Sequence, residues 1–298
     1  MTGLGQSRWR GYGETFSAAL VNGSIGTIVS YATMPVVMLV SLRMAFAAGA
    51  LALVLGLRRA WPRPRDRATA WRLVLLGLVL AANLTCYFIA IRETGVAVAI
   101  FTSYLAPVYV AVVAPRFTGG RTEPVVVVAL VVALAGMVTI LVPGLRGAGL
   151  DPGGLAAGVA AGAFYAIYLL LSKSLRRAGL EGTGIVFVIA AITAVVLLPW
   201  GLAQSTSADF TAVNVLMAAI LGVVTTALTF SLFIDGMHFV KVQHASIMGY
   251  IEPVSAPLYA FLILGQRPSG WTLAGGALIV AAGVLVVALG KAEEEVYG

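Results

Sequence analysis

The chain of 298 residues is poor in charged side chains and in the side chains that hold metals. Only 10% of its residues are Asp, Glu, Lys or Arg and 60% are hydrophobic, which is atypical of a soluble domain. Because the chain has a single cysteine, Cys86, it cannot form an intramolecular disulfide. With only two histidines besides, we expect no metal site. The chain has no phosphate-binding loop, no HExxH motif and no pair of intramembrane aspartates. We therefore expect no cofactor, no ATP-driven step and no enzymatic activity.

What the chain contains instead is about ten long apolar stretches, separated by short polar or basic breaks. A helix needs about 20 apolar residues to cross the hydrocarbon layer, where only helices and closed barrels satisfy their backbone hydrogen bonds. The stretches are continuous rather than alternating, which favours helices over a barrel. The sequence predicts an all-α polytopic membrane protein with ten transmembrane helices, at 12–30, 35–57, 73–92, 95–114, 124–143, 153–174, 182–203, 211–234, 243–264 and 270–290.

The basic residues are distributed unevenly between the two sides of these predicted spans. Fifteen Lys and Arg residues lie on the side of the two termini, six of them in the break at 58–72, and three lie on the other side. Because cytoplasmic loops carry the excess of Lys and Arg, both termini are expected in the cytoplasm, with the protein in the inner (plasma) membrane of a bacterium. This pattern accounts for the basic excess without a nucleic-acid partner.

A short motif occurs twice, at the same place in each half of the chain. The Tyr-Leu-Ala-Pro-Val run that starts at Tyr104 reappears as Tyr-Ile-Glu-Pro-Val at Tyr250, 146 residues later. This offset predicts two five-helix repeats, 1–145 and 146–298. Because five is an odd number, the second repeat enters the membrane from the opposite side. Inverted repeats with a site near the bilayer midplane are typical of secondary transporters, which use alternating access.

Prolines at corresponding positions of the two repeats predict interrupted helices. Pro107 and Pro253 belong to the repeated motif, and Pro257 adds a second expected break to the ninth span. In a transporter sequence, paired interruptions of this kind are the best indication of where the substrate binds.

Inverted five-helix halves with an aromatic-x-x-Pro motif resemble the drug/metabolite transporter superfamily, in particular its EamA-type ten-helix branch. The Leu-Arg-Met-Ala-Phe run from Leu42 resembles the start of the family's second helix, and the Glu-Pro pair at Glu252 resembles its second-half motif. Gln266 departs from the Gly-Glu pair that is usual in the family. The chain is also similar to bacterial exporters of aromatic amino acids in this branch. The resemblance implies a small organic substrate.

Polar and aromatic side chains within the spans are candidates for a substrate cavity, because polar groups are costly in hydrocarbon. Asn83 and Tyr87 share one helix face at i, i+4, and Tyr104 and Tyr250 are mates in the repeat. The alternatives are interfacial anchoring for tyrosines and bonding to their own helix for Ser and Thr. The predicted substrate-binding residues are Asn22, Asn83, Tyr87, Tyr104, Phe164, Tyr165, Tyr168, Thr229, Ser246 and Tyr250.

Two charged residues lie within predicted spans. Glu252 is predicted either to couple transport to protons or bind an amino group, or to be a structural carboxyl beside a broken helix. Arg43 is predicted either to bind a substrate carboxylate or to pack and snorkel outward.

The sequence thus predicts a monomeric secondary transporter or facilitator that exports small organic metabolites, which are expected to be amino acids, with aromatic ones favoured. Export of drugs or nucleotide-sugar-like metabolites is the alternative. A membrane-embedded lipid-modifying enzyme and a pore-like channel are further alternatives. The expected partners are a small-molecule substrate, the lipid bilayer and a proton if transport is coupled.

Overall fold

The computed structural model describes residues 2–118, 122–145 and 151–291, and all regular elements in these ranges are helical. The predicted all-α membrane fold is confirmed. The elements are α1 (Thr2–Asn22), α2 (Ser24–Val29), α3 (Val36–Arg58), α4 (Arg67–Thr94), α5 (Val96–Ser103), α6 (Ala106–Thr118), α7 (Pro124–Leu145), α8 (Pro152–Arg177), α9 (Gly182–Gln204), a 3-10 turn η1 (Ser207–Asp209), α10 (Ala212–Gly222), a π-helical segment η2 (Val223–Leu228), α11 (Thr229–Gly236), α12 (Val242–Met248), α13 (Ile251–Leu264) and α14 (Gly270–Leu289).

Nine helical segments in the described ranges are long and apolar enough to cross a membrane. The first predicted span, 12–30, is not among them, because α1 begins earlier and carries Arg8, Arg10 and Glu14. This span is divided between α1 and α2 at Gly23, where a Cβ atom would collide with Ser255 Oγ. A glycine is therefore needed where the first helix crosses α13.

Two of the spans consist of half-helices that meet at a short break. One break separates α5 from α6 at Tyr104, and the other separates α12 from α13 at Tyr250. Pro107 and Pro253 lie in the first turn after these breaks, where a proline costs no helical hydrogen bond. The prediction of a break at Pro257 is wrong: α13 continues through it, losing one backbone donor without ending.

The helices of the two halves start at matching positions. Residues Val36 and Gly182 begin α3 and α9, and Val96 and Val242 begin α5 and α12, with a difference of 146 in each case. The expected repeat boundary between residues 145 and 146 falls at the edge of a segment outside the described residues.

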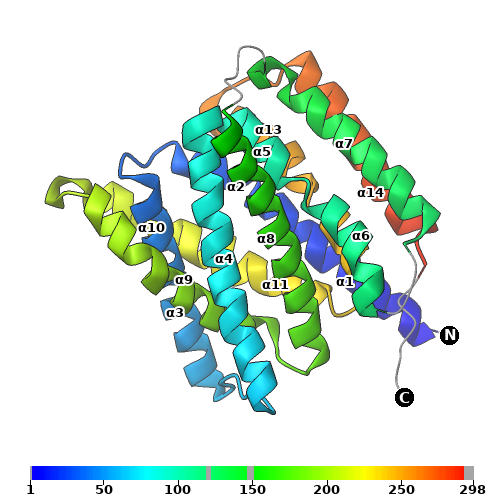
Figure 1. Ribbon diagram of the computed structural model, residues 1–298, viewed down its shortest axis with the longest axis horizontal. Coiled ribbons are helices and arrows are strands. Elements are labelled where there is room, and N and C mark those ends of the chain that lie inside the picture. Colours follow the sequence, from blue (N-terminus) through cyan, green and yellow to red (C-terminus); the bar gives the residue numbers. More distant parts are fainter. Residues whose placement is uncertain (1, 119–121, 146–150, 292–298) are drawn as a thin grey trace.

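The pair α7 and α14 lies along one edge of the bundle (Figure 1). Glycines allow the two helices to approach closely. A Cβ on Gly136 would meet Gly275 and Ile279, and a Cβ on Gly275 would meet Gly136 and Ile140. Gly136 of α7 faces Ile279 of α14, whereas Ile140, four residues later on α7, faces Gly275, four residues earlier on α14. The two helices are therefore antiparallel. Small residues that bring backbones together are typical of helix packing in membranes.

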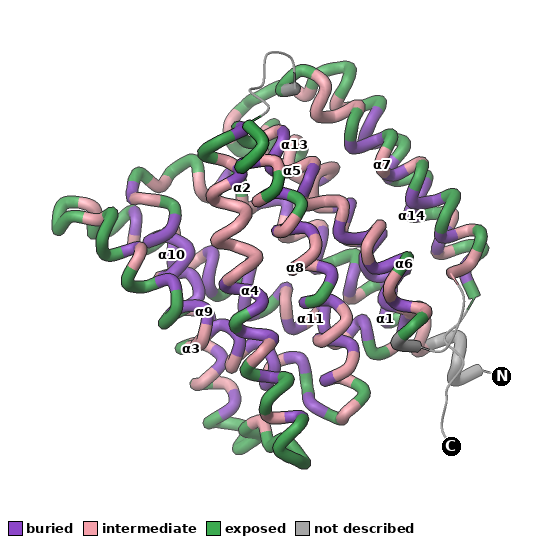
Figure 2. The backbone as a smooth tube through the Cα atoms, in the orientation of Figure 1, coloured by how far each residue is buried: buried purple, intermediate pink, exposed green. Residues whose placement is uncertain are grey.

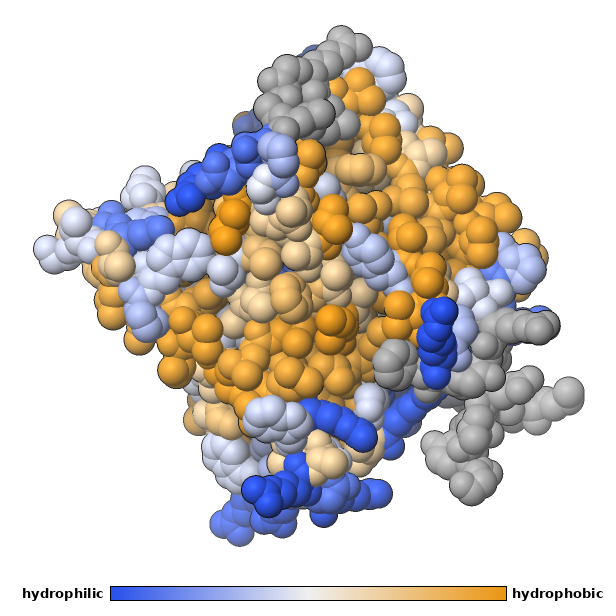
Figure 3. Space-filling view, viewed as in Figure 1, coloured by the Kyte–Doolittle hydropathy of each residue, from blue (hydrophilic) through white to orange (hydrophobic). Residues whose placement is uncertain are grey.

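The buried residues face the inside of the bundle, whereas exposed residues gather on its outer faces and ends (Figure 2). Many of the exposed side chains are large and apolar, for example Leu57, Val195 and Leu262. Figure 3 shows apolar atoms over the middle of the molecule and hydrophilic atoms at its ends. This distribution fits a lipid-covered belt between two polar surfaces.

We expect Gly275→Ala to destabilise the protein, because the added methyl group would lie 2.7 Å from Ile140 Cγ1 and would also collide with the Gly136 carbonyl. Overpacking of this kind costs about 1–3 kcal/mol. Gly276→Ala is the matched control on the same helix, since its Cβ would meet only Val254 Cγ1 at 3.5 Å. Thermal unfolding in detergent should show a lower midpoint for the first variant alone. Equal midpoints would contradict the close contact of α7 with α14.

Candidate functional site

A cavity of about 270 Å³ lies among the helices and combines polar, aromatic and charged side chains. Its walls come from both halves of the chain, and both helix breaks reach it. The lining residues are Ala19, Asn22, Ile25, Arg43, Met44, Leu80, Asn83, Leu84, Tyr87, Ser103, Tyr104, Tyr165, Tyr168, Phe230, Phe233, Gly249 and Glu252. Six of the ten predicted substrate-binding residues are in this set, as are both predicted charged residues.

Arg43 is turned into the bundle and is only 9% exposed. Its Nε donates to Thr226 Oγ1 at 2.6 Å, and its Nη2 donates to the Thr225 carbonyl at 3.0 Å. Both acceptors belong to the π-helical segment η2, and the guanidinium also lies 5.8 Å from the centre of the Phe230 ring. π-Helical segments are frequent at functional sites. The alternative that Arg43 snorkels outward is wrong, because these acceptors hold the side chain inside.

Glu252 lies in the first turn of α13, directly after the second helix break. Tyr104 and Arg43 line the same cavity as its carboxyl group. The positive end of the half-helix dipole also favours a carboxylate there. The cavity therefore contains one acidic and one basic group.

Two asparagines supply the uncharged polar wall. Asn83 Nδ2 donates to the Ala161 carbonyl at 2.7 Å, and Asn22 Oδ1 accepts from Thr229 Oγ1 at 2.7 Å. These bonds use one end of each amide group, so the other end is available to a ligand. Thr229, a predicted substrate-binding residue, does not line the cavity, but its hydrogen bond orients the Asn22 side chain.

Stacked aromatic rings form another wall. Tyr165 and Tyr168 stack with centroids 5.8 Å apart, and Tyr168 contacts Phe230 at 6.3 Å. Tyr104 stacks on Tyr250 at 5.7 Å. Rings of this kind are suited to contact apolar groups, and the tyrosine hydroxyls can form hydrogen bonds as well.

Three other predicted residues do not line the cavity. Tyr250 is fully buried behind Tyr104 and donates to its carbonyl at 2.6 Å. Ser246 is buried and donates to the Gln243 carbonyl of its own helix, as the alternative for such residues predicts. Phe164 packs against the hydrophobic core.

Repeat mates account for most of the lining. Five pairs separated by 146 residues line the cavity together: Ala19 and Tyr165, Asn22 and Tyr168, Leu84 and Phe230, Tyr87 and Phe233, and Ser103 and Gly249. Phe230 and Phe233 were missed by sequence reasoning, yet the offset applied to helix 67–94 would have found them. The charges do not follow the repeat, because Arg43 corresponds to Ile189 and Glu252 to Ala106.

Near the two termini, a polar network links four parts of the chain. Glu123, just before α7, accepts from Lys241 Nζ at 2.5 Å and from the Lys291 backbone amide at 2.8 Å. His244 Nε2 lies 3.6 Å from the same carboxylate, and its Nδ1 is 2.7 Å from the Tyr12 hydroxyl. We call these five residues the closing network, because they tie α1, α7, α12 and α14 together at one end of the bundle.

Comparisons with known proteins agree with this architecture. An uncharacterized transporter of Archaeoglobus fulgidus is 36% identical over 71% of this chain and 75% of its own length. The threonine/homoserine exporter RhtA of Escherichia coli is 26% identical over 70% of this chain and 68% of its own. A solved crystal structure matches with a TM-score of 0.78, covering 92% of this chain and 96% of its own at 22% identity, which supports the fold alone.

The model of the EamA-like transporter family matches residues 9–142 and again residues 152–288. These two ranges contain every residue that lines the cavity. The chain is a membrane transporter and belongs to the EamA-like transporter family.

Proposed function

We propose that the protein exports amino acids across the bacterial inner membrane by alternating access. The observation that carries this proposal is the presence of Arg43 and Glu252 in one small cavity. An amino acid at neutral pH carries a carboxylate and an ammonium group, which match a guanidinium and a carboxylate respectively. Arginine is suited to the carboxylate because its planar group can bind two oxygens at once.

The size and lining of the cavity favour an amino acid over larger substrates. Its volume of about 270 Å³ is below the range of roughly 300–1,000 Å³ that holds drug-sized ligands, which disfavours nucleotide sugars. Tyr165, Tyr168 and Phe230 offer an aromatic wall for the substrate side chain, which favours aromatic amino acids. Export of threonine and homoserine by the relative RhtA supports the amino-acid class.

We further propose that the two five-helix halves, 1–145 and 146–298, move against each other around the cavity. In this scheme the closing network lies on the cytoplasmic side, in agreement with the basic residues of that side. The network must open before a substrate enters from the cytoplasm. Glu123 belongs to the first half and Lys241 to the second, so separation of the halves would break their ion pair.

Transport by purified protein in proteoliposomes tests the proposed substrate class. We expect uptake of labelled aromatic amino acids to exceed that of nucleotide sugars. Loss of the guanidinium in Arg43→Gln should weaken amino-acid transport by about 10- to 100-fold, because a hydrogen bond to a charged group contributes about 1.5–3 kcal/mol. Arg92→Gln is the control, since Arg92 is exposed and pairs with its neighbour Glu93.

Two results would contradict the proposal. Transport of nucleotide sugars but of no amino acid would give the cavity a different substrate class. Equal transport by wild type and Arg43→Gln, with equal amounts of folded protein, would leave Arg43 a packing role only.

A second prediction concerns Glu252 and protons. Glutamine keeps the shape of the side chain but cannot take up a proton. If Glu252 couples transport to protons, Glu252→Gln should abolish accumulation driven by a pH gradient and leave downhill exchange intact. Both activities are measured in the same proteoliposomes. A wild-type protein that ignores an imposed pH gradient would contradict coupling and favour facilitated diffusion.

A third prediction concerns the closing network. Burial acts to raise the pKa of Glu123, but hydrogen bonds from Lys241 and the Lys291 backbone, with His244 nearby, hold the pKa below its usual range. A depressed pKa stabilises the folded state above the unfolded value, and this contribution is lost as the pH falls through the folded value. Glu123→Gln should therefore lower stability by about 1.5–3 kcal/mol at pH 5.5–8. The difference should shrink only below about pH 4.5.

Melting temperatures in detergent between pH 4 and pH 8 measure this difference. Glu93→Gln serves as the control, because its partner Arg92 is an exposed chain neighbour. A difference that already disappears between pH 8 and pH 6 would show that ionised Glu123 does not hold the network together.

A further inference from the structure

The corner between α3 and α4 carries an unusual concentration of positive charge. Residues 58–72 contain six arginines and a single acidic residue, Asp66. The Asp66 side chain accepts from the Thr69 backbone amide at 2.7 Å, which caps the start of α4. Two tryptophans of this corner, Trp61 and Trp71, are 45% and 63% exposed. The arginines are Arg58, Arg59, Arg63, Arg65, Arg67 and Arg72.

The fold itself does not require these charges. The corresponding corner of the other half, 204–218, connects α9 to α10 and contains no Lys or Arg. Its one charged residue is Asp209, which corresponds to Arg63. Two corners at matching positions thus differ by their charge, as expected if the inverted repeat places the first on the cytoplasmic side and the second on the other, and the first corner concentrates positive charge beside the membrane.

The basic corner is held in place by packing. The Trp61 ring meets Phe187 of α9 edge-on, with centroids 5.5 Å apart. Pro62 lies against Gly184, where an added Cβ would be 3.1 Å away. These contacts fix the connection between α3 and α4 against α9, so the charges are presented on an ordered surface.

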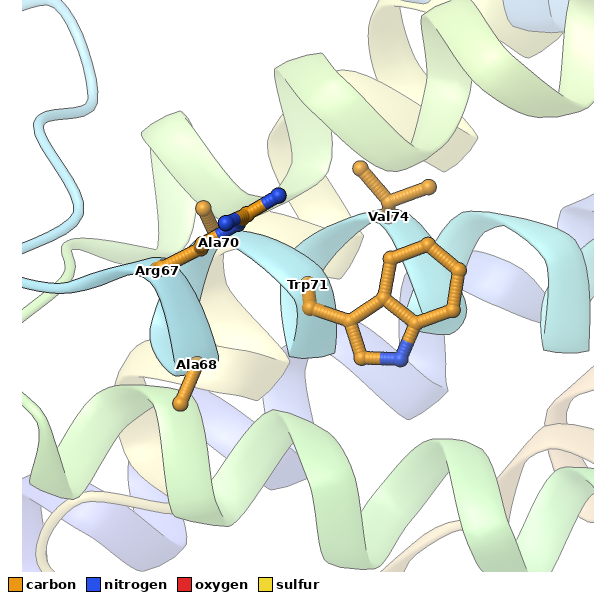
Figure 4. A pocket seen from close by; sticks show the side chains of 5 residues that line it. All are labelled: Arg67, Ala68, Ala70, Trp71 and Val74. Atoms are coloured by element: carbon orange, nitrogen blue, oxygen red, sulfur yellow. The ribbon is translucent and has the colours of Figure 1, made fainter.

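A shallow, open depression lies at the start of α4, bordered by Arg67, Ala68, Ala70, Trp71 and Val74. In Figure 4, Arg67, Trp71 and Val74 follow one another along the helix, and the short Ala70 side chain lies next to Arg67. The depression therefore has a cationic end and an apolar end.

The same helix face continues this order. Positions 67, 71, 74 and 78 recur at helical spacing, and Val74 and Leu78 are 38% and 41% exposed. At a rise of 1.5 Å per residue, this row spans about 16 Å, close to half of the roughly 30 Å hydrocarbon layer. The order of side chains along this row therefore matches the order of layers in one leaflet. The guanidinium lies at the level of the headgroups, the tryptophan at the interface and the aliphatic side chains at the level of the acyl chains.

We propose that this depression binds the headgroup of an anionic phospholipid. The guanidinium of Arg67 would contact the phosphate, with Arg72 adding charge from the next turn. Trp71 would lie against the glycerol region, and Val74 and Leu78 against an acyl chain. Arginine suits this role because its planar group binds two phosphate oxygens together. The proposal does not depend on the identity of the transported substrate.

Lipid binding to the purified full-length protein tests the proposal. Native mass spectrometry or titration in detergent would compare phosphatidylglycerol with phosphatidylcholine. Each arginine near an anionic headgroup contributes about 1 kcal/mol, which is roughly fivefold in affinity. The double variant Arg67→Gln/Arg72→Gln should therefore bind phosphatidylglycerol about 25-fold more weakly, and its affinity for phosphatidylcholine should not change. Arg67→Lys/Arg72→Lys should retain most of the binding, which shows that the corner remains folded.

Arg92→Gln is the matched control, because Arg92 is an exposed arginine at the opposite end of the same helix. It should bind phosphatidylglycerol as the wild type does. Inorganic phosphate in excess should not displace the lipid, since it cannot contact Trp71 and Val74. Equal affinity for both lipids, equal loss in the control variant, or displacement by inorganic phosphate would each overturn the proposal.

Discussion

The hydrogen bond from the Tyr250 hydroxyl to the Tyr104 carbonyl joins the two places where the membrane helices are interrupted. A broken helix inside a bilayer leaves backbone groups without partners, and lipid offers none. The Tyr250 side chain at the second break supplies a donor to the backbone carbonyl at the first break, and the two rings stack at 5.7 Å. Both breaks can therefore lie next to a cavity, with backbone and side-chain polar groups turned toward it.

The surroundings of these tyrosines show how a repeated fold acquires a directional site. Five pairs of repeat mates line the cavity, so the two halves contribute corresponding positions to it, although the residue type differs in every pair. The charged groups are not repeated: the mate of Arg43 is Ile189, and the mate of Glu252 is Ala106, both without charge. If the substrate is a zwitterion, as proposed, a single acid and a single base at non-matching positions would select the orientation in which it is held.

Sequence reasoning predicted the helices well because hydrophobic length is the main requirement of a membrane span. It was less successful where side-chain detail decides. The π-helical segment η2 has no signature in its residues Val223–Leu228, and it is this segment that turns Arg43 inward. The polar hydroxyl of Ser246 led to the prediction that it lines the cavity, but this hydroxyl donates its hydrogen bond to the Gln243 carbonyl of its own helix. Phe230 was overlooked because an aromatic ring within an apolar span has no distinguishing pattern without its mate Leu84.

The closing network places an ion pair at one end of the bundle that the matching positions of the other half do not repeat. Its residues Lys241 and Glu123 correspond to Gly95 and Ser269 in the other half, and neither of these can form an ion pair. At the end near α5, the pair Arg92 and Glu93 joins chain neighbours and links no helices. A contact of about 1.5–3 kcal/mol present in only one of two states biases their populations roughly ten- to hundredfold. Under the proposed alternating access, a substrate that opens the network would have to supply this difference through tighter binding to the opened state, and transport in the two directions would start from unequal populations.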